Sequence, residues 1–383
     1  MPRHEPCTRT HRLRGAGRFQ GRPAADDRMV GVAGGPLEQG GHGVRVCVTG
    51  GSGFIGSWFC REYARRGDEV VILDLVEPDP DLPHARFVHG DIRDPEAVRD
   101  AFEGCEAVLH LAAAHHDFGI TEATYFDVNE AGSSVICNGM DEAGIETICF
   151  YSTVAVYGTA PPPLEEDTVP VPESHYGRSK LAGELVFKEW VSRGAGRRCL
   201  VIRPTVTFGP HNFANMYSLI RQIDSGMFFQ AGSATNIKSL SYIENIMAAT
   251  LHLWDRDGAG GFEVFNWVEK PDMTSAGISL TVARALGRTS VRKLPLGLAL
   301  LMAKPFDIVI ALTGRNIPIS SARVRKLFVD QTKFEAEKAR QAGFVPSVSL
   351  EEGIQRMVEW YQAGGRDESA QWHQPPAEVV RRS

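Results

Sequence analysis

A glycine-rich segment between two regular stretches constrains the fold of this 383-residue chain more than any other feature. From Val44 to Gly56 the sequence reads VRVCVTGGSGFIG. Its first five residues form an apolar run of the length that a buried strand needs. Glycines follow at 50, 53 and 56, and apolar residues then recur at helical spacing until Gly67, a residue typical of a helix end. The segment therefore predicts a strand, a tight glycine turn and a helix.

The order strand, glycine turn, helix is the context in which a glycine triplet binds a dinucleotide. Gly50 permits the turn, Gly53 allows the backbone to approach a pyrophosphate, and Gly56 allows the helix to pack close to the strand. The N–H groups at the helix start, at Phe54 and Ile55, are predicted to face the phosphates. We expect these five residues to contact the cofactor.

A second apolar strand, over 68–74, ends in an acidic residue, Asp74. A carboxylate at this position accepts hydrogen bonds from the hydroxyls of the adenosine ribose. It would repel a 2′-phosphate, and Leu75 and Val76 supply no Arg to hold one. The sequence therefore predicts NAD rather than NADP.

Strands and helices continue to alternate along the first half of the chain. Further strands are expected at 86–89, 107–111, 147–151 and 199–202, and helices at 121–143 and 175–192. This alternation predicts right-handed βαβ units. We therefore expect an α/β fold in which a Rossmann-type doubly wound parallel sheet (44–203) is followed by a smaller C-terminal α/β substrate-binding region (204–363). A strand at about 262–267 is expected to return to the main sheet.

Composition indicates an ordinary globular protein, with 43% hydrophobic and 23% charged residues. A formal net charge of −6 argues against a nucleic-acid partner. The seven cysteines form no C-x-x-C pair, so we expect free thiols, no metal site and a reducing, cytoplasmic location. Residues 1–43, with seven Arg and no Lys, are expected to be a disordered extension, and 364–383 a polar tail.

An apolar run over 294–312 raises the question of a membrane segment. It contains Lys304, Pro305 and Asp307, and Pro would break a spanning helix. We therefore expect a buried or surface-amphipathic segment and no membrane span.

Candidate catalytic residues come from the predicted helix at 175–192 and the strand end before it. Tyr176 and Lys180 are four residues apart, which places them on one helix face. A free Tyr has a pKa of about 10, and a cation one turn away stabilises its phenolate. Ser152 and Thr153 follow the strand at 147–151, at the sheet edge where open α/β folds bind ligands. Their hydroxyls are predicted to orient a substrate hydroxyl beside Tyr176.

With these motifs in sequence order, the chain resembles the extended short-chain dehydrogenase/reductase family in its NAD-dependent epimerase/dehydratase branch. The resemblance covers roughly 44–363 and rests on TGGSGFIG (49–56), GDIRD (90–94), HLAA (110–113), STVAVYG (152–158), YGRSK (176–180) and RPTVTFGP (203–210). It implies a catalytic set of Thr153, Ser152, Tyr176 and Lys180. It also implies cofactor contacts that the residue patterns alone do not identify: Asp91, Ile92, Leu111, Ala112, Ala113 and Asn129, together with Tyr176 and Lys180.

The resemblance implies less about the substrate. Candidate contacts are His115, Asn212, Lys238 and Arg325. Many nucleotide-sugar enzymes of the branch carry Asn where this chain has Val206, and its 4,6-dehydratases usually have Asp-Glu after the catalytic Thr, where this chain has Val154-Ala155. The first departure argues against a nucleotide-sugar substrate, and the second argues against a dehydratase. The family usually forms homodimers through two helices, here 121–143 and 175–192.

Two enzymatic hypotheses follow. The first is a nucleotide-sugar epimerase, on a UDP-hexose at C4, through a transient 4-keto intermediate. The alternative is an NAD-dependent dehydrogenase/reductase of a hydroxysteroid-like or other alcohol or ketone, which Val206 and the apolar 294–312 run favour. A non-catalytic dinucleotide-binding module is disfavoured because the chain keeps Tyr176 and Lys180.

Overall fold

The structure is a computed structural model that describes residues 43–115, 120–313 and 320–368. The predicted N-terminal extension, apart from its last residue, and most of the polar tail lie outside these ranges.

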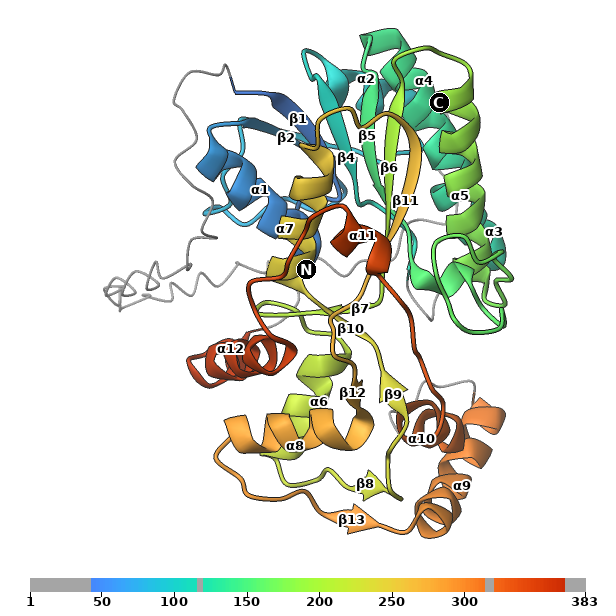
Figure 1. Cartoon of the computed structure of the whole chain (residues 1–383), viewed down its shortest axis with the longest axis vertical. Coiled ribbons are helices and arrows are strands. Elements are labelled where there is room, and N and C mark those ends of the chain that lie inside the picture. The colour runs from blue at the N-terminus through green and yellow to red at the C-terminus, as the bar shows by residue number, and fades with distance from the viewer. Residues whose placement is uncertain (1–42, 116–119, 314–319, 369–383) are drawn as a thin grey trace, which may run out of the picture. The chain divides into compact units, whose positions relative to one another are not determined.

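A seven-stranded sheet formed by strands between residues 45 and 267 is the centre of the fold (Figure 1). Every pair of neighbours in it is parallel, in the order β11-β6-β5-β4-β1-β2-β3. The strands are β1 (Arg45–Thr49), β2 (Glu69–Asp74), β3 (Arg86–His89), β4 (Ala107–His110), β5 (Thr147–Tyr151), β6 (Arg198–Pro204) and β11 (Gly261–Trp267). The order turns back at β1 and β4, which creates the switch point where such sheets bind ligands. The predicted Rossmann-type α/β fold is confirmed.

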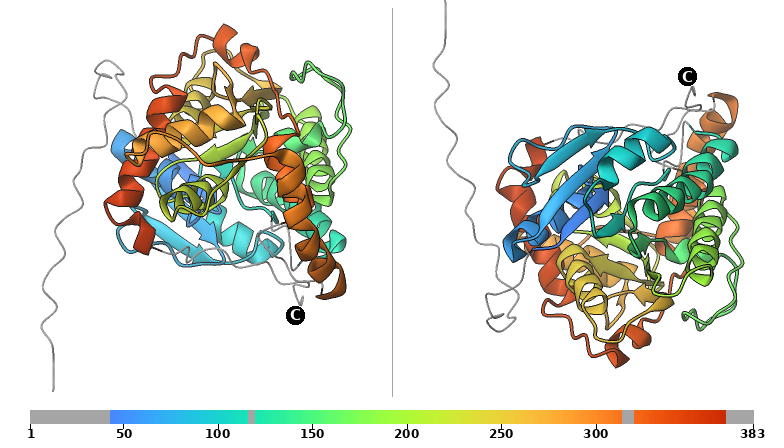
Figure 2. Two further views of the ribbon diagram at one scale, coloured as in Figure 1. Left: turned by 90° about the horizontal axis from the view of Figure 1, so that it is seen from below. Right: turned by 90° about the horizontal axis from the view of Figure 1, so that it is seen from above.

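Alternate side chains of the strands enter two separate cores because successive residues point to opposite faces. In β1, Val46 and Val48 pack into one core and Cys47 into the other. Two helices, α1 (Phe54–Arg66) and α7 (Ile243–Trp254), cover the first face. The other face is covered by α2 (Pro95–Phe102), α4 (Gly132–Ala143) and α5 (His175–Ser192), so that helices flank the sheet on both sides (Figure 2).

The predicted helix at 121–143 is divided into three parts. It comprises α3 (Glu122–Phe126), a π-helical turn η1 (Asp127–Ala131) and α4, which ends at Gly144 in the left-handed region. A single wide turn of this kind inside a helix is frequent at functional sites. The expected helix at 175–192 has the same limits as α5.

After β6 the chain forms short strand pairs and helices. The strands are β7 (Val206–Phe208), β8 (Gln230–Ala231), β9 (Ile237–Lys238), β10 (Leu240–Tyr242), β12 (Met273–Thr274) and β13 (Lys293–Leu294), and they pair as β7–β10, β9–β12 and β8–β13. The helices are α6 (Asn215–Asp224), α8 (Ser275–Ala285), α9 (Leu296–Thr313), α10 (Ser321–Phe328), α11 (Glu337–Gln341) and α12 (Leu350–Gln362), and single turns form at η2 (Val154–Val156) and η3 (Gly365–Asp367).

The apolar run at 294–312 forms α9, which lies beside α10 at the end of the molecule far from the main sheet (Figure 1). Among the described helices, none has the length and apolar character needed to cross a bilayer.

Candidate active site

The glycine turn after β1 has the shape that a dinucleotide requires. Gly50 has φ of 73°, a left-handed conformation that favours glycine. A Cβ on Gly50 would lie 2.8 Å from the N atom of Ala112, and one on Gly56 would lie 2.4 Å from the carbonyl oxygen of Gly50. The turn therefore has no room for side chains at these two positions, and the backbone is open to a ligand at the start of α1.

The start of α1 carries neither a capping side chain nor an acidic residue that would compete with a phosphate. Its N-cap is Gly53, no side chain caps it, and its first turn holds no acidic residue. Phe54 and Ile55 supply N–H groups of this first turn, whose partial positive charge suits an anion.

Asp74 ends β2 and turns its carboxylate toward the glycine turn. One oxygen accepts from the N–H of Ser52 at 3.0 Å and the other from the N–H of Val76 at 3.2 Å. Burial raises the pKa of Asp74, while these N–H donors act to lower it. The carboxylate thus lies beside the turn, where a ribose would extend from the pyrophosphate.

The segment after β4 passes directly over the glycine turn. The N–H groups of Leu111 and Ala112 donate to the carbonyl of Thr49 at 3.0 and 3.1 Å. Asn129, on the π-helical turn, holds the next residues: its Oδ1 accepts from the N–H of Ala114 at 2.8 Å and its Nδ2 donates to the Ala114 carbonyl at 3.0 Å. Leu111, Ala112 and Ala113 are therefore fixed beside the cofactor turn.

Asn129 also connects this segment to α5. Its Nδ2 donates to the hydroxyl of Ser179 at 2.9 Å, one residue before Lys180. Both polar atoms of the Asn129 side chain are thus engaged within the protein. Its role as a direct cofactor contact stays a prediction.

Asp91 and Ile92 follow β3, next to the end of β2. Both carboxylate oxygens of Asp91 accept from the guanidinium of Arg93, at 3.0 and 2.8 Å, and Arg93 also reaches Asp127 at 2.6 Å. Ile92 is buried. Both residues are near the ribose end of the turn, and their contact with adenine remains a prediction.

Lys180 is buried on α5, with its Nζ 4.1 Å from the centroid of the Phe150 ring. Burial lowers the pKa of Lys180 to about 7, and the charge of Glu184, one turn further along α5, acts to raise it. His110, at the end of β4, is also buried, which lowers its pKa to about 3 and keeps it neutral. Lys180 can therefore supply a positive charge one turn after Tyr176, and a ligand negative charge would favour its charged form.

Tyr176 is on the first turn of α5 and is partly exposed. Its ring lies 6.4 Å from that of Tyr125 on α3. The next residue, Gly177, packs against the turn that follows β5: a Cβ there would lie 2.5 Å from the carbonyl oxygen of Ala155. The start of α5 and the turn after β5 are therefore in direct contact, and Tyr176 and Thr153 belong to the two segments that meet there.

Ser152 and Thr153 differ in what their hydroxyls do. The Thr153 Oγ1 accepts from the N–H of Ala155 at 3.1 Å and caps η2. The Ser152 hydroxyl donates a very short hydrogen bond to Glu184, in the protein interior. The Thr153 hydroxyl thus caps a turn and keeps its own proton to donate, whereas the Ser152 hydroxyl is bonded to a buried carboxylate.

Behind this edge lies a buried polar network that the sequence patterns did not identify. Glu184 accepts from Arg203 of β6 at 2.9 and 2.6 Å, Arg203 donates to the hydroxyl of Tyr157 at 2.9 Å, and Tyr157 donates to Asn266 of β11 at 2.8 Å. One sequence feature could have indicated this network: Glu184 follows Lys180 by four residues, which places a second charge on the same face of the helix.

The candidate substrate residues do not form one cluster. His115 is exposed just after the β4 segment, and Asn212 shapes the loop before α6 by accepting from the N–H of Ala214 at 2.8 Å. Lys238 donates to the carbonyls of Lys326 and Asp330 at 2.6 and 2.7 Å. Arg325 is exposed on α10. A substrate contact by any of the four stays a prediction.

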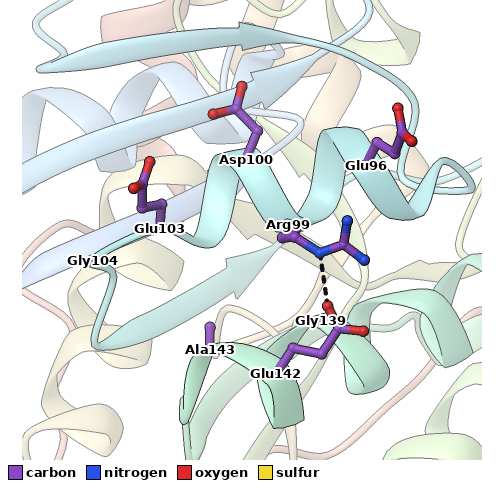
Figure 3. Close-up of a pocket in the computed structure, with 8 residues that line it drawn as sticks. All are labelled: Glu96, Arg99, Asp100, Glu103, Gly104, Gly139, Glu142 and Ala143. Carbon is purple, nitrogen blue, oxygen red and sulfur yellow. Dashed lines mark hydrogen bonds and ion pairs between the residues drawn. The ribbon is translucent and has the colours of Figure 1, made fainter.

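A hollow between α2 and α4 is separate from this edge (Figure 3). Charged side chains line most of it, and Arg99 donates to Glu142 across it at 2.9 Å. Gly104 and Ala143, which also line it, lie shortly before β4 and β5. It therefore reaches toward the edge where strands begin, whereas ligands of such folds bind where strands end.

The residues at the strand ends fit NAD: a turn with no room for a side chain at Gly50 or Gly56, a helix start without a side-chain cap and a carboxylate at the end of β2. A model of the NAD-dependent epimerase/dehydratase family matches residues 46–266. A 4-epimerase of N-acetyl-α-D-glucosaminyl-diphospho-ditrans,octacis-undecaprenol from Escherichia coli O157:H7 is 35% identical over 82% of this chain and 94% of its own length. A UDP-glucose 4-epimerase from Vibrio cholerae is 26% identical over 84% of this chain and 97% of its own.

Solved structures share the fold. The UDP-glucose 4-epimerase of Thermotoga maritima, solved with UDP-glucose, aligns with a TM-score of 0.66 and 23% identity over 84% of this chain and 99% of its own. The family match and the sequence relatives, not the shared fold, confirm the predictions of NAD as cofactor and of an epimerase of the nucleotide-sugar type. The chain belongs to the NAD-dependent epimerase/dehydratase family, within the extended short-chain dehydrogenase/reductases.

Proposed function

We propose that the protein is a 4-epimerase of a hexose or N-acetylhexosamine carried on a diphosphate, acting through a transient 4-keto sugar. The observation that supports the proposal is the contact between Gly177 of α5 and Ala155 in the turn after β5. Tyr176 and Lys180 flank this contact on α5, and Thr153 begins the turn. A base, a cation and a hydroxyl at the same edge suit removal of a proton from a secondary alcohol.

In this proposal Tyr176 takes the proton of the C4 hydroxyl, and Thr153 orients that hydroxyl. Lys180 provides the positive charge that lowers the pKa of the Tyr176 phenol. NAD, held by the glycine turn and Asp74, would supply a reversible hydride acceptor for C4. Once the keto sugar has turned over in the site, Tyr176 gives the proton back to the C4 oxygen.

The diphosphate can be joined to a nucleoside or to a polyprenol, and the two relatives named above differ in this respect. The assay therefore offers the purified protein UDP-glucose, UDP-N-acetylglucosamine and polyprenyl-diphosphate N-acetylglucosamine, without added NAD. We expect C4 inversion of at least one substrate with no net NADH. Tyr176→Phe should lower the rate by about 10²–10⁴-fold.

A matched control is Tyr361→Phe, which removes a phenol hydroxyl that donates to Asp224 at 3.1 Å on α6. This variant should keep the wild-type rate within about twofold. Absence of inversion for every sugar tried would contradict the proposal. Stoichiometric NADH release from an alcohol would favour the dehydrogenase alternative, which Val206 supports.

We also propose that the protein is cytoplasmic and forms a homodimer through α5 and the α3–α4 pair, which pack against each other within one subunit. Light scattering should give twice the chain mass of 42.0 kDa. A value equal to a single chain would contradict the dimer.

A further inference from the structure

The outer face of α9 is apolar where a surface helix is normally polar. Exposed side chains recur at helical spacing along it: Leu298 (44%), Leu301 (60%), Met302 (59%), Ile308 (60%), Val309 (43%) and Leu312 (81%). Positions three and four residues apart share one side of a helix, so these six form a continuous stripe. We call this set the α9 stripe. Contiguous exposed apolar surface of this kind marks an interaction site.

The opposite side of α9 is anchored, so the stripe faces outward in a fixed direction. Ala303 is buried, and Leu296 and Ala299 pack against the first core. Asp307 accepts from the N–H of Ser321 at 2.9 Å and so connects α9 to the first residue of α10. The stripe therefore belongs to a helix that is already packed, and it needs a partner on its outer side alone.

The chain around the stripe is strongly basic. Residues 288–333 contain nine Lys and Arg against two Asp, in a protein whose formal net charge is −6. Among them, Lys293 precedes α9, Lys304 lies within it, and Arg325 and Lys326 are on α10, all four with exposed side chains. An apolar helix face with basic neighbours is the combination that binds the interface of an anionic membrane.

We propose that the α9 stripe and the basic residues beside it dock on the surface of an anionic phospholipid bilayer. The helix would lie in the interface rather than span it, because α9 carries a charged residue, Lys304, in its middle and no described helix can cross a bilayer. A second copy of the chain is a poorer partner, since a symmetric contact would bring two basic surfaces together. Membrane docking does not depend on the proposed function. Its consequence, that the enzyme could reach a sugar linked to a lipid, does rest on the proposed function.

The test measures sedimentation of the full-length protein with phosphatidylcholine vesicles, with and without phosphatidylglycerol. We expect binding to the mixed vesicles. Leu301→Gln with Ile308→Gln should weaken it at least about tenfold, because two apolar side chains leave the interface. Lys304→Gln with Lys326→Gln should weaken it by about fivefold per charge, on the anionic vesicles only.

The matched control replaces exposed apolar residues elsewhere, Val169→Gln with Val345→Gln, which are 75% and 80% exposed. This control should bind vesicles like the wild type. The Leu301→Gln, Ile308→Gln variant should turn over a water-soluble substrate at the wild-type rate, so loss of docking is distinguishable from loss of the epimerase activity. Wild-type protein that stays in solution with anionic vesicles would overturn the proposal. Normal vesicle binding by the Leu301→Gln, Ile308→Gln variant would also overturn it. The same holds if this variant differs from the wild type only by a lower molar mass in solution, because the stripe would then be a contact between copies of the chain.

Discussion

The buried pair between Glu184 and Arg203 supports a strong prediction about stability. Their side chains are 3% and 5% exposed, and two hydrogen bonds of 2.9 and 2.6 Å join them. Burial acts to lower the pKa of Arg203, but the hydrogen bond and charge of Glu184 raise it overall. In Glu184→Gln the guanidinium stays charged and buried without its counter-charge. Two unit charges about 4 Å apart interact by about 4 kcal/mol at an effective dielectric constant of 20, and breaking a buried pair costs about 3–5 kcal/mol.

Thermal unfolding measures the effect. At about 2 °C per kcal/mol for a chain of this size, Glu184→Gln should lower Tm by about 6–10 °C. Glu142→Gln makes the same chemical change at an exposed pair with Arg99, where both side chains are more than half exposed, and should leave Tm near the wild-type value. Because Ser152 donates to Glu184, the first variant should also lower the turnover rate of folded enzyme. Equal Tm values for the two variants would refute the view that burial makes this pair costly to break.

Two further predictions concern the cofactor turn and the buried cation. Gly50→Ala should lower NAD affinity, measured by calorimetry, at least about tenfold and destabilise the fold, because the new Cβ would lie 2.8 Å from the N atom of Ala112. The control is Gly67→Ala, at a similar φ of 84° with open space around it. It should lose only the free energy of unfolding that left-handed strain costs, about 1–2 kcal/mol, and should bind NAD like the wild type. Burial lowers the pKa of Lys180 in the nucleotide-free fold to about 7, so between pH 7 and 10 the unfolded chain binds more protons and stability rises with pH. Lys180→Met removes this pH-dependent contribution to stability. The Tm of the wild type minus the Tm of the variant should therefore increase from pH 7 to pH 10. A difference that stays constant over this range would contradict the lowered pKa of Lys180.

Local signals made the cofactor half of the protein predictable from its sequence. The glycine turn, Asp74 and the Tyr176–Lys180 spacing each depend on residues within a few positions of one another. The alternation of strands and helices then determined which strand ends meet, because parallel strands share one carboxyl edge.

Contacts between distant segments were not predictable in the same way. Glu184 meets Arg203 from another element, and Tyr157 meets Asn266 more than a hundred positions away. The π-helical turn at Asn129 was missed because a helical period does not reveal one extra residue in a turn. For α9, an apolar run fits a buried helix and an exposed one equally well, and only its packing showed which side faces outward.

The substrate half shows why one sheet edge can support several reactions. Tyr176, Lys180 and Thr153 would serve an epimerase and a dehydrogenase alike, so specificity must come from the region after β6. There, Val206 is exposed at the position where many nucleotide-sugar relatives carry Asn, and Lys238 donates to carbonyls at the carboxyl end of α10. Lys238 thus connects β9, near the substrate region, to the helix that carries the basic residues of the proposed membrane surface. A cation used in this way holds the two regions together, and recognition of a diphosphate would then require either other donors or a movement of α10 that releases Lys238.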